Sequence, residues 1–388
     1  MRYRLKPLLS ALVLGAVFAL AAPAARADDV LDRGVGSEWS SLDPHVNFDA
    51  AAGWIQMDAY EGLVSFASDG TIIPGAAESW EASEDGRIYT FHLRDGLKWS
   101  NGDPLVAQDY VNGALRTLNP ATASEKGYYF YSVLQIKGAK ELAEGTTADT
   151  AGFGITAPDA RTVVVEMLEP APHILDIMGA FAMSPLHTPS FEANGAGVFI
   201  DPSKLVSNGA YVIKEIVPQS HVYLEANPNY WDAANVGVKK VKYHVTEDVS
   251  TELKRYQAGE IDITYDIPLN QIEALKAEIP GEVHISPSTE VVYYSFNLTD
   301  EALSNIDLRR ALSLAIDRET LEAKIVKGEA IPVLGYAGGF DPTYPGPVIA
   351  EASMTQAERE ALAKELYAKA GFGPDNPLKV NIVTTVAE

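Results

Sequence analysis

The sequence predicts a mixed α/β protein with more than one domain, and three observations support this prediction. The chain has 388 residues, more than a single hydrophobic core usually organises. Its residues are 47% hydrophobic and 21% charged, a composition typical of folded globular domains. Segments whose apolar residues alternate, as in strands, occur in the same chain as segments with helical spacing.

The first 27 residues have the pattern of a secretory signal peptide. Three basic residues within the first six give a positive start, residues 8–22 carry no charge, and small residues precede a cleavage point after Ala27. The alternative is a membrane anchor, but an apolar run of about 15 residues is shorter than the ~20 that span a bilayer. We therefore expect export, with cleavage after Ala27.

The first half of the mature chain predicts several strands and a helix. Residues 88–93 alternate, with Tyr89, Phe91 and Leu93 on one face, and Asp85-Gly86 before them predicts a tight turn. A helix is expected at about 107–118. Further strands are expected at residues 162–167, 222–224 and 238–245.

From Asp307 onward the sequence predicts mainly helices. Asp307 is expected to cap the first of them, and Asp317 a second one that ends near Gly328. Residues 335–347 indicate a loop. Thr355 and Glu358 form a capping box, in which the threonine hydroxyl accepts from the Glu358 N–H, and a strand is expected at 378–384.

The absence of cysteine helps to indicate the cellular compartment of the protein, and its net charge limits the partners that it can bind. The chain has no cysteine, so it has neither disulfides nor a lipid-bearing N-terminal cysteine. Export without an anchor indicates the periplasm of a Gram-negative cell. After Ala27 there are 26 basic and 53 acidic residues, a net charge of −27. Such a surface repels nucleic acids and anionic lipid, so we expect neither as a partner.

The motifs of common enzymes are absent from the sequence. It has no G-x-S-x-G elbow, no H-E-x-x-H pair and no phosphate-binding G-x-x-x-x-G-K-[ST] loop. The seven histidines are scattered, so a metal site would need distant residues. Because the chain has 53 acidic residues, a pair of carboxylates for glycoside hydrolysis could always be proposed, so such a pair is not evidence for that activity. We expect no catalytic residue, no metal and no cofactor.

Aromatic residues are the most conspicuous candidates for ligand contacts. The chain has five tryptophans and 18 tyrosines, and the densest cluster runs from Tyr128 to Tyr131. Such side chains combine an apolar body with a polar tip and can line a cleft for varied solutes. Packing in a core or between domains is the alternative role for each of them.

A series of short blocks resembles the extracellular solute-binding proteins of peptide ABC importers, of the oligopeptide- and dipeptide-binding type. The blocks occur in the order of that family and cover nearly all of the mature chain, and residues 278–284 resemble the oligopeptide branch in particular. The other blocks are residues 41–45 (SLDPH), 60–63 (YEGL), 74–80 (PGAAESW), 89–94 (YTFHLR), 98–104 (KWSNGDP), 107–110 (AQDY), 207–211 (SNGAY), 227–231 (NPNYW), 255–262 (RYQAGEID) and 309–318 (RRALSLAIDR).

The resemblance implies a two-lobed periplasmic-binding-protein type II fold with an additional inserted domain. Residues 28–60 and 186–286 would form the first lobe, 61–185 the inserted domain, and 287–388 the second lobe. Members of the family continue well beyond the length of this sequence, so the second lobe is expected to be incomplete. A fragment, a truncated product and one half of a split protein are the alternatives.

The resemblance also implies where a ligand would bind. The family holds an extended ligand between two lobes, and the ligand pairs with protein main chain in large, wet pockets. The segment after His45 would face this cleft, and the aromatic cluster would supply a contact from the inserted domain. The expected ligand-binding residues are Phe48, Asp49, Ala50, Tyr128 and, from a strand of the second lobe, Tyr294, Phe296 and Asn297.

The implied function is capture of short peptides and their delivery to a permease and ATPase complex in the inner membrane, by a monomeric binding protein that is not an enzyme. Within the same family the ligand could instead be a nickel complex, an opine, a sugar or an antibiotic. A secreted hydrolase, or a chaperone or signalling protein that holds unfolded chain or cell-wall peptide, are the alternatives from other classes.

Overall fold

The computed structural model describes residues 30–46, 49–180, 183–285, 291–327, 330–336 and 349–383. The predicted signal peptide therefore lies outside the described residues. The chain divides into two compact units: unit 1 is Met1–Glu247 with Lys254–Tyr265, and unit 2 is Asp248–Leu253 with Asp266–Glu388. Among the helices of the described residues, none is long and apolar enough to cross a membrane.

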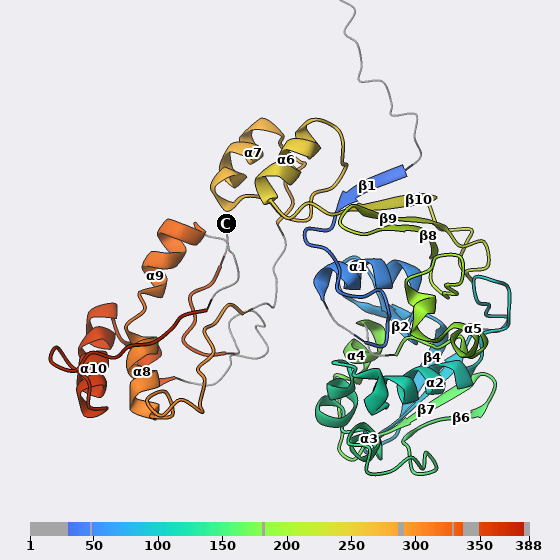
Figure 1. Ribbon diagram of the computed structural model, residues 1–388, viewed down its shortest axis with the longest axis horizontal. Coiled ribbons are helices and arrows are strands. Elements are labelled where there is room, and N and C mark those ends of the chain that lie inside the picture. Colours follow the sequence, from blue (N-terminus) through green and yellow to red (C-terminus); the bar gives the residue numbers. More distant parts are fainter. Residues whose placement is uncertain are drawn as a thin grey trace, which may run out of the picture. The chain divides into compact units, whose positions relative to one another are not determined.

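One four-stranded sheet of unit 1 is built from the start of the chain and from residues 211–244. The first strand runs parallel to its neighbour, and the other pairs are antiparallel. Helix α1 (Ala50–Ala59) packs against this sheet (Figure 1). The strands, in spatial order, are β1 (Val30–Gly34), β10 (Lys240–His244), β9 (His221–Ala226) and β8 (Tyr211–Val217).

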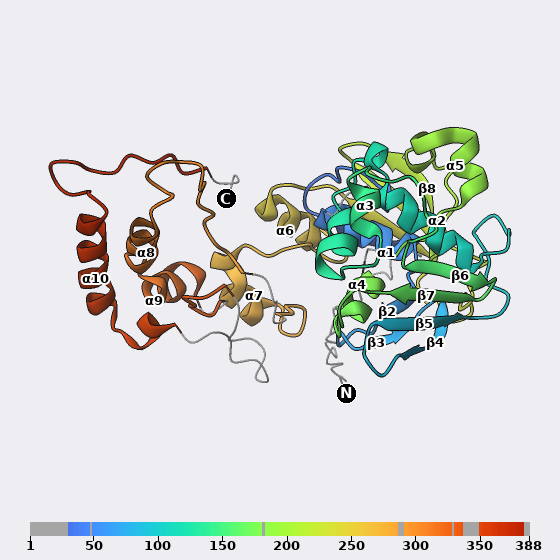
Figure 2. The ribbon, with the colours of Figure 1, turned by 90° about the horizontal axis from the view of Figure 1, so that it is seen from below.

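A second four-stranded sheet of unit 1 is antiparallel throughout. Helix α2 (Ala107–Leu118) lies over two of its strands, β6 and β7 (Figure 2). In spatial order the strands are β4 (Ala77–Ala82), β5 (Ile88–Leu93), β7 (Thr162–Glu166) and β6 (Ile155–Asp159). Unit 1 also contains a two-stranded sheet, β2 (Val64–Phe66) with β3 (Ile72–Pro74), and the helices α3 (Ala139–Ala143), α4 (Ile174–Ala180) and α5 (Thr188–Asn194).

Each sheet of unit 1 has its own hydrophobic core. The core beside α2 is formed by residues between 63 and 183, and the core beside α1 by residues 35–60 and 186–243. Because strand side chains alternate, Phe91 and Leu93 of β5 both enter the first core, as the pattern predicts.

Unit 2 is mainly helical where it is described. The boundary between the units falls within α6 (Val249–Gln257). Helices α8 and α10 pack against each other through Ala311, Leu314, Ala363 and Leu366. The other helices are α7 (Ile272–Glu278) and α9 (Arg318–Leu321), and the packed pair has the bounds Ile306–Leu314 for α8 and Gln356–Lys369 for α10.

The structure confirms several local predictions. The mixed α/β class is correct, and α2 has the predicted bounds. Asp317 caps α9, and Thr355 with Glu358 forms the predicted capping box of α10. The helix predicted to end near Gly328 can be described only as far as Lys327, because residues 328 and 329 lie outside the described part.

Three local predictions are wrong. Asn305, not Asp307, caps α8: its side chain accepts from the N–H groups of Asp307 and Leu308, while the Asp307 carboxylate pairs with Lys369 at 2.8 Å. Residues 378–383 are not a strand, and neither are residues 291–297, which contain the proposed second-lobe contacts. No described segment pairs with either stretch, and a strand requires a partner for its backbone hydrogen bonds.

Candidate functional site

The turn before α1, residues 43–46, is fixed by a buried ion pair. Arg116 of α2 donates from Nη1 and Nη2 to the Asp43 carboxylate, at 2.6 and 2.5 Å. Arg116 Nη1 also lies 2.8 Å from His45 Nδ1, and His45 Nε2 lies 3.0 Å from the carbonyl oxygen of Ser184. Since a guanidinium only donates, Nδ1 accepts and Nε2 carries the hydrogen.

The charges of this cluster follow from its burial. Burial alone would raise the pKa of Asp43, but hydrogen bonds from the His45 backbone N–H and the Arg116 guanidinium outweigh it and lower that pKa to about 2. Burial lowers the pKa of His45, whose ring is enclosed. Asp43 is therefore ionised and His45 neutral at neutral pH. The turn is consequently attached to α2 by one strong charge-assisted pair.

A second loop is attached to the same turn. Lys126 Nζ donates to the carbonyl oxygen of Pro44 at 2.7 Å and to Gln56 Oε1 at 3.2 Å. The neighbouring Glu125 N–H donates to the carbonyl oxygen of Val46 at 2.9 Å. These bonds bring the start of α1 and the aromatic cluster from Tyr128 together, although the two segments are far apart in sequence.

Three of the sequence-predicted site residues are described in unit 1. Asp49 caps α1, since its Oδ1 accepts from the Ala52 N–H at 2.6 Å, and Ala50 is the exposed first residue of that helix. Tyr128 is 51% exposed, with its ring edge-on to Tyr129 and Tyr131. Phe48 lies outside the described residues.

The remaining predicted residues belong to unit 2. Tyr294 is 63% exposed and Phe296 is half-buried. Asn297 Oδ1 accepts from the N–H and hydroxyl of Thr299, at 3.1 and 2.8 Å, and so closes a local turn. An exposed tyrosine is free to contact a ligand, whereas the oxygen of Asn297 is already engaged.

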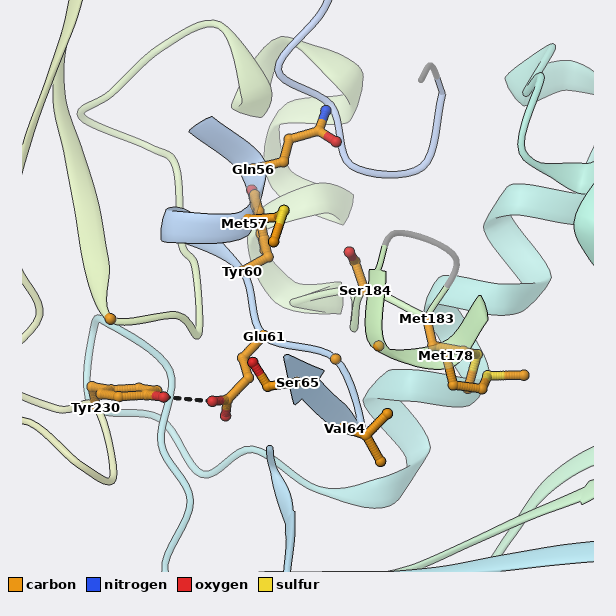
Figure 3. Close-up of a pocket in the computed structure, with 13 residues that line it drawn as sticks. Gln56, Met57, Tyr60, Glu61, Val64, Ser65, Met178, Met183, Ser184 and Tyr230 are labelled. Carbon is orange, nitrogen blue, oxygen red and sulfur yellow. Dashed lines mark hydrogen bonds between the residues drawn. The ribbon is translucent and has the colours of Figure 1, made fainter. Parts of the chain in front are cut away.

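Unit 1 also contains a pocket of about 200 Å³ beyond the end of α1 (Figure 3). It was not predicted from the sequence, because its walls come from segments more than a hundred residues apart, although three of the family-like blocks, 60–63, 207–211 and 227–231, contribute to it. Glu61 points toward Tyr230 with Ser65 beside it, and methionines contribute flexible apolar surface (Figure 3). Its lining residues are Gln56, Met57, Tyr60, Glu61, Gly62, Val64, Ser65, Met178, Gly179, Met183, Ser184, Ala210 and Tyr230.

The carboxylate of Glu61 is the principal charge of this pocket. It accepts from the Tyr230 hydroxyl at 2.5 Å and from Trp231 Nε1 at 2.8 Å. Burial raises the pKa of Glu61 to about 7, although both hydrogen bonds and the nearby Arg94 favour its ionised form. The Arg94 guanidinium also stacks on the Trp231 ring, 3.6 Å from its centre.

The pocket and the anchored turn offer contacts for binding. Hydroxyl, amide and carboxylate groups stand beside aromatic rings and thioethers, the mixture found in ligand-binding cavities. In the part of the chain that the structure describes, no group of three or more His, Cys, Asp or Glu residues could hold a metal ion.

Comparison with known proteins defines the class of this chain. Its mixed α/β fold is that of two-lobed periplasmic peptide-binding proteins. The structure of the murein tripeptide-binding protein MppA of Escherichia coli matches 90% of this chain and 68% of its own, with 34% identity and a TM-score of 0.83. The structure of Haemophilus influenzae OppA in complex with the peptide RPPGFSPFR matches 91% of this chain and 69% of its own, with 31% identity and a TM-score of 0.82.

The chain belongs to the bacterial extracellular solute-binding proteins, family 5, whose model for the middle region matches residues 71–388. Members of this family are solute-binding proteins and not enzymes. The periplasmic oligopeptide-binding protein OppA of Escherichia coli is 34% identical over 362 residues, which are 92% of this chain. This chain spans 65% of the length of that relative.

Proposed function

We propose that this protein is the solute-capturing component of a periplasmic ABC importer and that its ligand is a short peptide. One observation carries the proposal: about nine tenths of the chain matches peptide-binding proteins in sequence and fold, and one of these was solved with a nonapeptide in place. The expected mechanism is capture between two lobes, closure, and release of an unaltered ligand to a permease and ATPase complex in the inner membrane.

The proposed ligand contacts come from both units. Phe48, Asp49, Ala50 and Tyr128 would contribute from unit 1, and Tyr294, Phe296 and Asn297 from unit 2. The joint anchoring of residues 43–46 and 124–128 supports the first group, because it brings two of the proposed segments to one place. The exposed side chain of Tyr294 supports its proposed role as a ligand contact.

The proposed domains have the same boundaries as in the sequence analysis. The two cores of unit 1 support them, since one core lies within residues 61–185 and the other within 28–60 and 186–286. The core between α8 and α10 lies within 287–388. Export with cleavage after Ala27 and a monomeric state belong to the same proposal.

Calorimetric titration of the purified protein with trialanine and with RPPGFSPFR tests the proposal. We expect a saturable heat of binding, a higher unfolding temperature with peptide, and no cleavage of the peptide in chromatography. Binding only of a nickel complex, an opine or a sugar would overturn the peptide assignment, and appearance of peptide fragments would support the hydrolase alternative.

Single substitutions test the proposed contacts. Tyr128→Ala and Tyr294→Ala should each weaken peptide binding without lowering the unfolding temperature, because both rings are largely exposed. Tyr223→Ala, on β9, is the control for loss of a tyrosine elsewhere in unit 1. An unchanged affinity in either test variant removes that residue from the site.

A further inference from the structure

Lys126 is a buried lysine whose ammonium group contacts the turn before α1. The residue is 1% exposed. Its Nζ donates to the Pro44 carbonyl and to Gln56. The backbone N–H of the preceding residue, Glu125, donates to the Val46 carbonyl. The lysine thus binds the main chain of the turn on one side and the side chain of an α1 residue on the other.

This position connects two groups of proposed ligand contacts. Asp49 and Ala50 follow the turn closely in sequence, and Tyr128 follows Lys126 by two residues. Gln56, which accepts from Lys126, also donates from Nε2 to the Asp43 carbonyl at 3.2 Å and lines the pocket beyond α1. A movement of the ammonium group would therefore shift both segments relative to each other.

The charges around Lys126 compensate only part of the free-energy cost of burying its ammonium group. Asp43 and Asp49 attract the ammonium, but Asp43 is already bound to Arg116, and His45 beside them is neutral. Burial is the larger effect and lowers the pKa of Lys126 to about 8. A buried charge lowers the stability of a fold, so an apolar side chain of similar length would serve packing better. Ionisable groups with strongly perturbed pKa values cluster at functional sites.

We propose that Lys126 is a positioning residue for ligand capture, which holds the Pro44 carbonyl and Gln56 of α1, and through them Asp49 and Ala50 at the start of α1, in place relative to Tyr128. The proposal rests on the proposed function. A residue with a purely structural role would lower stability when removed. Lys126, in contrast, should lower affinity when removed while stability is unchanged or higher.

The titration of Lys126 gives a readout that packing alone would not produce. As pH rises through about 8 the ammonium loses its proton, and the attraction to Asp43 and Asp49 disappears. Peptide affinity should therefore fall between pH 7 and 9. Because the pKa in the folded protein lies below the value of 10.5 for a free lysine, the cost of burying the charge is present below pH 8 and is relieved as pH rises toward 10.5.

The experiment compares Lys126→Met with Lys137→Met, which removes an exposed lysine paired with Glu166. At pH 7 the dissociation constants for trialanine and RPPGFSPFR should rise about tenfold in Lys126→Met only. The peptide's own α-amino group also titrates at about pH 8. The fall in affinity between pH 7 and 9 should therefore be smaller in Lys126→Met than in Lys137→Met, and the difference reports Lys126. The unfolding temperature of Lys126→Met at pH 7 should equal or exceed that of the wild type. If the methionine variant does not fold, Lys126→Gln takes its place.

Hydrogen exchange without ligand tests the anchoring separately. Amides of residues 46 and 49–52 should exchange faster in Lys126→Met than in Lys137→Met, while those of β5 and β7 stay unchanged. An unaltered affinity with an unaltered pH response overturns the proposal, and so does faster exchange throughout unit 1 with a lower unfolding temperature. If neither peptide binds the wild type, the proposed function is wrong, whereas unaltered exchange at these amides refutes the positioning role by itself.

Discussion

At the level of single residues, the described part of unit 1 contains titratable groups whose pKa shifts act in opposite directions. Burial lowers the pKa of His45, so its contribution to stability is present above pH 6.5 and is lost as pH falls below that value. Glu61 behaves in the opposite way. Its pKa is raised from 4.5 to about 7, so its contribution is present below pH 4.5 and is lost as pH rises toward 7.

The variant Glu61→Gln should therefore gain stability relative to the wild type as pH rises. The amide imitates the protonated acid and carries no charge, so the loss of stability that the wild type shows between pH 4.5 and 7 should be absent. Urea unfolding at pH 5 and pH 8 measures the difference. Glu78→Gln, which removes a surface carboxylate from the same unit, controls for net charge. An identical difference between Glu61→Gln and the wild type at both pH values would contradict the prediction.

At the level of elements, α1 depends on Asp49 for its first turn. One carboxylate oxygen accepts from the Ala52 N–H, and the other accepts from the N–H and hydroxyl of Ser40, at 2.9 and 2.6 Å. The residue therefore fixes both the start of the helix and the loop that precedes the anchored turn.

Asp49→Ala should lower the free energy of unfolding by about 1 kcal/mol, the usual effect of losing an N-cap. Asp49→Asn keeps the acceptor for Ala52 but loses one acceptor used by Ser40, so its effect should be smaller. Chemical denaturation of both variants measures these effects. Equal stability of the alanine variant and the wild type would show that the cap contributes nothing.

Helix caps with a local cause could be predicted from the sequence, and so could strands with a clear alternation, such as β5 and β7. Two other predicted strands are wrong because no described segment pairs with them. The caps at Asp317 and Thr355 need only residues within one turn, and both predictions are confirmed. The strands predicted around residues 293–297 and at 378–384 needed partner strands that sequence alone does not reveal. The prediction of Asp307 as a cap missed Asn305 by two residues, since both types cap helices.

The candidate site shows the same division. The short motif around His45 and the aromatic cluster at Tyr128 indicated two segments that the structure places together. Lys126 and Glu61 were missed because their partners lie 82 and 169 residues away in sequence, and no periodicity marks such pairs. Their burial became apparent only in three dimensions.

At the level of the whole molecule, the two units differ in the size of their cores. In the described part of the chain, the two clusters of unit 1 contain 28 and 15 buried hydrophobic residues, whereas the cluster of unit 2 contains four. Unit 2 also exposes large apolar side chains, among them Val292, Tyr294 and Ile325. Little apolar contact means a low free energy of local opening.

Amides of α8 and α10 should therefore exchange with solvent faster than those of α2 and β5 in the unliganded protein. Hydrogen exchange followed by mass spectrometry at neutral pH measures both groups in one sample, so α2 and β5 of unit 1 serve as the internal control. Equal protection in the two units would contradict the prediction and would indicate that unit 2 is stabilised by more than its described core.

The contacts of Trp231 give the molecule an intrinsic optical probe. One edge of its indole donates to Glu61, and the Arg94 guanidinium covers its face. Charges so close to an indole change the energy of its excited state. The chain has four other tryptophans, so the difference between the emission of the wild type and that of Trp231→Phe should follow the ionisation of Glu61 near neutral pH. The acidity of a half-hidden pocket could thus be followed by spectroscopy, without any attached dye.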